Sequence, residues 1–166
     1  MYDIGSPWFA PLRFLHMLGA MALLGTLLCC LVLKLQADRT ADPGHASRTH
    51  DGFRKADTVL IAPSALAVFA AGYAIVRFLG SRIAGHWFAV WGLILFFVAA
   101  GFWYFGVRPL NGKLALEADA CVKQKEPLSL AYGKMSVAWL ASTVLAILAL
   151  VLATLVMVFR VQLGMA

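Results

Sequence analysis

Four long apolar stretches constrain this chain more than any other feature of its sequence. They cover about residues 12–33, 58–79, 87–107 and 135–159, and a helix needs roughly 20 predominantly apolar residues to cross a bilayer. Charged residues make up only 13% of the chain, against about 25% in soluble domains. We therefore predict one integral membrane domain over residues 1–166.

None of the four stretches alternates apolar with polar residues, as the strands of a membrane barrel do. Within a bilayer, a helix satisfies its own backbone hydrogen-bonding groups in one segment. The prediction is an all-α, four-helix transmembrane bundle with up-down-up-down topology. The second helix is expected to begin at Asp57 or Thr58 and to bend at Pro63, and the Arg108-Pro109 pair is expected to end the third.

The distribution of Lys and Arg predicts the orientation. Most of them lie in or beside the first and third connections: Lys34, Arg39, Arg48, Arg54, Lys55, Arg108, Lys113, Lys123, Lys125 and Lys134. The positive-inside rule places these connections in the cytoplasm and both termini outside, which is the periplasmic side if the membrane is the cytoplasmic (inner) membrane of a Gram-negative bacterium. The net charge of +6 then favours contact with the lipid bilayer and its anionic headgroups over nucleic acid.

The first connection also contains His45 and His50. Their loose spacing is not that of a metal site, and we interpret both as solvent-exposed loop residues. All eight carboxylates are expected to lie outside the apolar stretches, whereas proton-coupled pumps usually bury one. The sequence therefore argues against a transporter, and it leaves enzymatic activity open.

Small and weakly polar residues recur at helical spacing on two of the stretches and are expected to face other helices. They are Gly19, Ala20, Thr26 and Cys30 on the first stretch, and Ser136, Trp139, Thr143 and Ala146 on the fourth. Cys29 and its neighbour Cys30 point about 100° apart on a helix, so we interpret them as packing residues.

His16 carries the strongest functional signal. It lies about one turn inside the first stretch, and the small residues Gly19 and Ala20 leave room beside it for a flat ring or a neighbouring helix. His86, directly before the third stretch, is expected at a similar depth in the membrane and on the same side of it as His16. The two imidazoles are therefore candidate axial ligands of one haem b iron.

Arg13, Arg77 and Arg82 are expected at the same end, where they are candidates for pairing with the haem propionates. Two functional hypotheses follow. In the first, a small membrane haem protein takes part in electron transfer or quinone-linked redox work. In the second, the chain is a non-catalytic accessory or assembly subunit of a larger membrane complex, and His16 is structural. A homo-oligomer is compatible with both hypotheses.

Three segments resemble a family of bacterial four-helix predicted integral membrane proteins of unknown function. "LRFLHMLGAMALLG" (12–25) contains the Leu-His-x-Leu-Gly pattern of that family's first helix. "DTVLIAPSALAVFAAGYAIV" (57–76) and "HWFAVWGLILFFVAAGFWYFGVRP" (86–109) resemble its second and third helices. The resemblance implies the same four-helix fold and no particular activity.

More distantly, His16 resembles the first-helix histidine of the copper-resistance D type membrane proteins. It also resembles that of the bacterial membrane protoporphyrinogen oxidase, a four-helix haem protein. The resemblance implies a haem-ligand role for His16 alone. The oxidase has lysines in its later helices, whereas the third and fourth stretches here contain none.

Overall fold

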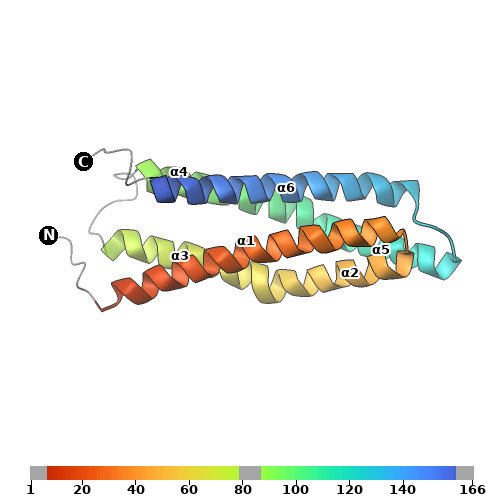
Figure 1. Ribbon diagram of the computed structural model, residues 1–166, viewed down its shortest axis with the longest axis horizontal. Helices are drawn as coiled ribbons and strands as arrows, with labels where there is room; N and C mark the ends of the chain where they lie inside the picture. The colour runs from red at the N-terminus through yellow and green to blue at the C-terminus, as the bar shows by residue number, and fades with distance from the viewer. Residues whose placement is uncertain (1–6, 79–86, 160–166) are drawn as a thin grey trace.

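The computed structural model describes residues 7–78 and 87–159, and leaves residues 1–6, 79–86 and 160–166 undescribed. The described residues form an elongated bundle of four helical rods without strands (Figure 1). Each rod is long and apolar enough to cross a membrane. The predicted four-helix transmembrane bundle is confirmed, while the orientation of its termini stays a prediction.

The first and fourth rods are single helices, α1 (Phe9–Thr40) and α6 (Leu130–Phe159). The second rod runs through α2 (Pro43–Ala56), the π-helical turn η1 (Asp57–Ile61) and α3 (Ala62–Phe78). The third runs through α4 (Trp87–Gly101), the π-helical turn η3 (Phe102–Val107) and α5 (Arg108–Gln124). In Figure 1, α1 lies along α3, α4 along α6, and α2 along α5.

The second helix is longer than predicted. It begins at Pro43 and not at Asp57 or Thr58. The carboxylate of Asp42 caps it by accepting the backbone N–H groups of Gly44 and His45 at 3.1 and 2.9 Å. The prediction of a loop here was wrong because α2 is a polar helix stabilised by packing against α5 and α1, and apolar length alone does not reveal such a helix.

The third helix also continues past its predicted end. Proline cannot donate a backbone hydrogen bond, and its ring crowds the carbonyl four residues earlier. For Pro109 that carbonyl belongs to Phe105, inside the wider turn η3, and for Pro63 it belongs to Val59, inside η1. Each π turn gives the proline ring room. The third helix therefore continues past Pro109, where it was wrongly predicted to stop, and it ends at Gln124.

We call the part of the bundle formed by α2, α5, the last turns of α1 and the first turns of α6 the polar end. Its core contains Phe53, Leu114, Tyr132 and Trp139, among other buried residues. A second apolar cluster, of Leu23, Leu27, Ile61 and Ile147, lies nearer the middle of the bundle. Ser136, Trp139, Thr143 and Ala146 are all buried, which confirms the predicted interior face of α6.

Candidate functional site

A buried lysine organises the polar end. Lys34 directly follows the last apolar residue of the first predicted span, and its exposed fraction is 0%. Its ammonium group donates to the carboxylate of Asp38, one turn further along α1. It also donates to the hydroxyls of Tyr132 at 3.2 Å and Ser136 at 2.7 Å, both on α6. Every hydrogen bond of this cation is therefore with an oxygen of α1 or α6.

His50 of α2 extends this network to α5. Its Nδ1 lies 3.2 Å from Oδ1 of Asn111, which also accepts the indole N–H of Trp139 at 2.7 Å. Because an indole N–H only donates, this oxygen is an acceptor and Nδ1 of His50 carries a proton. Nε2 is then an acceptor 3.4 Å from the hydroxyl of Tyr132.

These side chains form one hydrogen-bonded group that joins α1, α2, α5 and α6. We call it the Lys34 cluster, and its members are Lys34, Asp38, His50, Asn111, Tyr132, Ser136 and Trp139. No buried side-chain N or O atom among the described residues lacks a hydrogen-bond partner. The cluster thus fixes four helices through directional contacts at one level of the bundle.

The interpretation of His50 as an exposed loop residue was wrong, because its exposed fraction is 0%. Ala46, His50, Phe53 and Asp57 are all buried, and their spacing of three or four residues is that of one helical face. This periodicity was the sequence signal for a packed helix. It is easily overlooked because two of the four residues are polar.

Asp57 is a second buried polar group, at the point where the two π turns meet. Its carboxylate accepts the indole N–H of Trp103 at 2.5 Å, and its other oxygen lies 3.6 Å from Nε of Arg108. Asp57 directly precedes the apolar stretch 58–79 and so lies outside the predicted spans, as expected. It stands within the helix that it was expected to start, and a tryptophan and an arginine of the third rod compensate its burial.

His16 lies between α1 and α3. Its Nδ1 is 2.8 Å from the carbonyl oxygen of Val68, and its ring packs on Gly72, where an added Cβ would lie 2.9 Å from Cε1. A carbonyl only accepts, so Nδ1 carries the proton and Nε2 holds the lone pair. Among the described residues, Nε2 has no hydrogen-bond partner.

The other predicted haem contacts are only partly described. Arg13 and Arg77 are both exposed. His86 and Arg82 lie outside the described residues, so the bis-histidine arrangement and the arginine pairing stay predictions. Gly19 packs closely on α3, where an added Cβ would lie 3.2 Å from the carbonyl oxygen of Ser64. Its expected close approach to another helix is confirmed.

We expect Gly19→Leu to lower the free energy of unfolding by about 2–3 kcal/mol, because the larger side chain forces α1 away from α3. Unfolding in mixed detergent micelles, followed by circular dichroism, measures this change. Gly25→Leu is the matched control on the same helix, since a Cβ there meets nothing within 4 Å. Equal losses in the two variants would contradict the close packing of α1 on α3.

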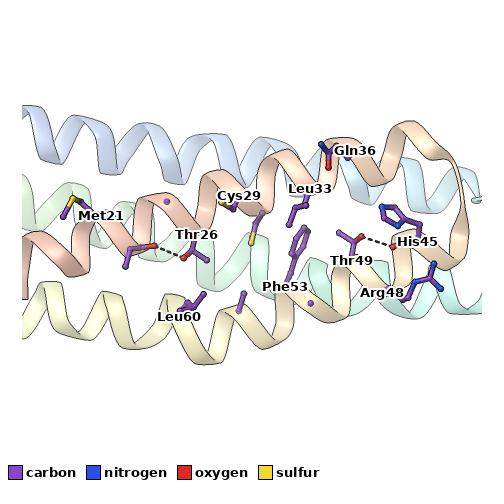
Figure 2. A pocket seen from close by; sticks show the side chains of 15 residues that line it. Met21, Thr26, Cys29, Leu33, Gln36, His45, Arg48, Thr49, Phe53 and Leu60 are labelled. Carbon is purple, nitrogen blue, oxygen red and sulfur yellow. Dashed lines mark hydrogen bonds between the residues drawn. The ribbon is translucent and has the colours of Figure 1, made fainter.

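A groove follows the seam between α1 and the second rod (Figure 2), with a volume of about 680 Å³. Ligand pockets commonly measure roughly 300–1,000 Å³. One end of the groove is apolar, with Met21 and Leu60, and the other end carries Gln36, His45 and Arg48. Of the described residues that line it, only Arg48 carries a formal charge and none is acidic.

Phe53 connects the groove with the Lys34 cluster. Its ring lines the groove and stacks on Trp139, with centroids 5.7 Å apart and planes inclined by 14°. It also meets the ring of His50 edge-on, at a centroid distance of 5.5 Å. The hydrogen-bonded cluster thereby supports one wall of the groove, which was not predicted from the sequence.

Comparisons with known proteins give one match. A family described as "Predicted integral membrane protein (DUF2269)" matches residues 10–161, which include nearly all of the described helices. No curated protein and no solved structure matches the chain.

Proposed function

The chain belongs to the DUF2269 family of predicted integral membrane proteins, whose function is unknown, and we propose that it binds an amphiphile of the surrounding bilayer in the groove of Figure 2. The family match confirms the resemblance inferred from the sequence. The more distant likeness to the copper-resistance proteins and the oxidase stays a prediction.

The change of polarity along the groove carries this proposal. On α1 the groove extends from Met21 to Gln36, which is about 22 Å at about 1.5 Å per residue. The hydrocarbon of one leaflet is only about 15 Å thick, half of a core of about 30 Å. An amphiphile bound there would have its tail in the hydrocarbon and its head among the polar side chains.

Two glycines keep the groove open. Gly25 of α1 and Gly52 of α2 both line it, and a Cβ added at either would contact nothing within 4 Å. Behind them, Phe53 is only 4% exposed and is held by Trp139. A groove with an ordered wall and unfilled space is suited to retaining one ligand, unlike a helix surface that exchanges lipid freely.

Gly25→Phe tests the proposal, because its ring would fill the groove without displacing another helix. We expect wild-type protein, purified in mild detergent and examined by native mass spectrometry, to retain one amphiphile per chain. Occupancy in Gly25→Phe should fall about tenfold, equivalent to about 1.4 kcal/mol.

The control is Gly101→Phe on α4, where a Cβ also meets nothing within 4 Å and which does not line the groove. Wild-type protein without a bound amphiphile, or equal occupancy in the two variants, would contradict the proposal. A quinone in the wild-type spectrum would support amphiphile binding and connect it with redox work.

A second candidate function is electron transfer through haem b held by His16. Histidines that bind metals commonly donate their other ring N–H to a carbonyl, and the contact of Nδ1 with Val68 has this form. Nε2 would then be the atom available to hold the haem iron, and haem would supply one-electron redox chemistry. This candidate predicts a Soret band in wild-type protein that persists in His45→Ala and disappears in His16→Ala, and colourless wild-type protein would contradict it.

The hypothesis of an accessory or assembly subunit predicts a different outcome. The chain would then purify from its native membrane with a second protein, and a homo-oligomer would appear as a multiple of its own mass. Native mass spectra show whether a second protein, an oligomer or an amphiphile is bound, and the absorption spectrum of the same preparation shows whether haem is bound. One preparation therefore separates the three hypotheses.

A further inference from the structure

We infer that the groove holds an anionic phospholipid, with its phosphate at Arg48 and an acyl chain extending toward Met21. The inference rests on the proposed function, which requires an amphiphile, and it adds the chemical class of the head.

Arg48 forms no ion pair with any other residue that the structure describes. The ion pairs between described residues are Lys34 with Asp38, Arg54 with Asp51, and Arg108 with Asp57, and Arg48 is in none of them. The carboxylate of Asp42, which caps the start of the same helix, lies near the guanidinium group but forms no ion pair with it. The guanidinium group therefore offers its donors at the polar end of the groove.

The groove offers further donors beside this charge. Gln36 comes from α1, and His45 and Arg48 come from α2, so polar side chains of both walls gather at one end (Figure 2). Thr49 is already occupied, because its hydroxyl donates to the carbonyl oxygen of His45 at 2.9 Å. Guanidinium binds phosphate with two parallel hydrogen bonds, and amide and imidazole N–H groups add single ones.

The depth of the polar end of the groove also fits a phosphate. The apolar stretch of α1 ends at Leu33, which lines the groove, and Gln36 follows about 4–5 Å further along the helix axis. Side chains at this level lie in the headgroup layer and not in the hydrocarbon. An anionic head would gain an ion pair with the exposed guanidinium group of Arg48 there, whereas a neutral head, such as that of a quinone, would not, so an anionic head is favoured.

The test uses delipidated full-length protein, titrated in detergent with phosphatidylglycerol or phosphatidylcholine of identical acyl chains and read by native mass spectrometry. We expect wild-type protein to bind phosphatidylglycerol at least about tenfold more tightly. Arg48→Gln should abolish this preference by weakening the binding of phosphatidylglycerol about tenfold. The control Arg54→Gln, also on α2 but outside the groove, should retain it.

Equal affinity of wild-type protein for both lipids, or a preference that persists in Arg48→Gln, would overturn the anionic class. If wild-type protein showed no such preference but Gly25→Phe still abolished the binding of both lipids, the proposed function would stand. The headgroup of the bound amphiphile would then belong to another chemical class. If neither lipid bound wild-type protein, this inference would fail and the proposed function would depend on the amphiphile found in the native preparation. If Gly25→Phe bound both lipids as tightly as wild-type protein, the proposed function and this inference would fail together.

Discussion

Lys34→Met is expected to lower the free energy of unfolding by about 3–5 kcal/mol, the usual cost of removing one partner of a buried ion pair. The substitution leaves the Asp38 carboxylate without its cation. It also removes the donor that Tyr132 and Ser136 share. Detergent-induced unfolding followed by circular dichroism measures the loss.

Two companion variants separate the ion pair from a general effect of losing a lysine. Lys113→Met, at an exposed position of α5, should change stability by less than about 0.5 kcal/mol. The double variant Lys34→Met/Asp38→Leu should recover much of the loss, because replacing both partners of a buried pair by apolar residues is often neutral. A double variant no more stable than Lys34→Met would show that the pair itself is not the source of the effect.

Trp139→Ala is expected to cost about 3–5 kcal/mol, as large truncations in a packed core do. Trp139 is 1% exposed, stacks on Phe53 and donates to Asn111. Trp139→Phe keeps an aromatic ring but loses the N–H donor, and it should cost only about 1–2 kcal/mol.

The matched control is Trp91→Ala on α4, whose indole is 54% exposed, and its effect should be far smaller. Trp139→Ala should also reduce the retention of the bound amphiphile, since Phe53 would lose the ring that orders it. A stable Trp139→Ala protein with full occupancy would contradict the coupling of the cluster to the groove.

The number of membrane helices was predictable because the bilayer imposes it. An apolar stretch of this length has few alternatives to a spanning helix, and Gly19 identified a packed face because only small residues allow that approach. The boundaries at the polar end were not predicted. α2 is held by contacts of His50 and Phe53 with other helices, and the local sequence around a proline does not reveal a π turn such as η3.

The candidate site was even less accessible from sequence. His50 and Lys34 are far from Asn111, Tyr132 and Ser136 along the chain, and only the bundle brings them together. The groove depends on how α1 turns relative to α2, and a helix with apolar residues on every side does not define that rotation.

A crosslinking experiment decides whether the groove is occupied. One equivalent of phosphatidylglycerol with a diazirine in its acyl chain is added to delipidated protein, illuminated, and the adducts are mapped by mass spectrometry. We predict adducts concentrated at residues 21–33 of α1 and at Leu60, and their loss in Gly25→Phe. Adducts spread equally over exposed positions elsewhere, such as Phe97 and Leu148, would contradict amphiphile binding in this groove.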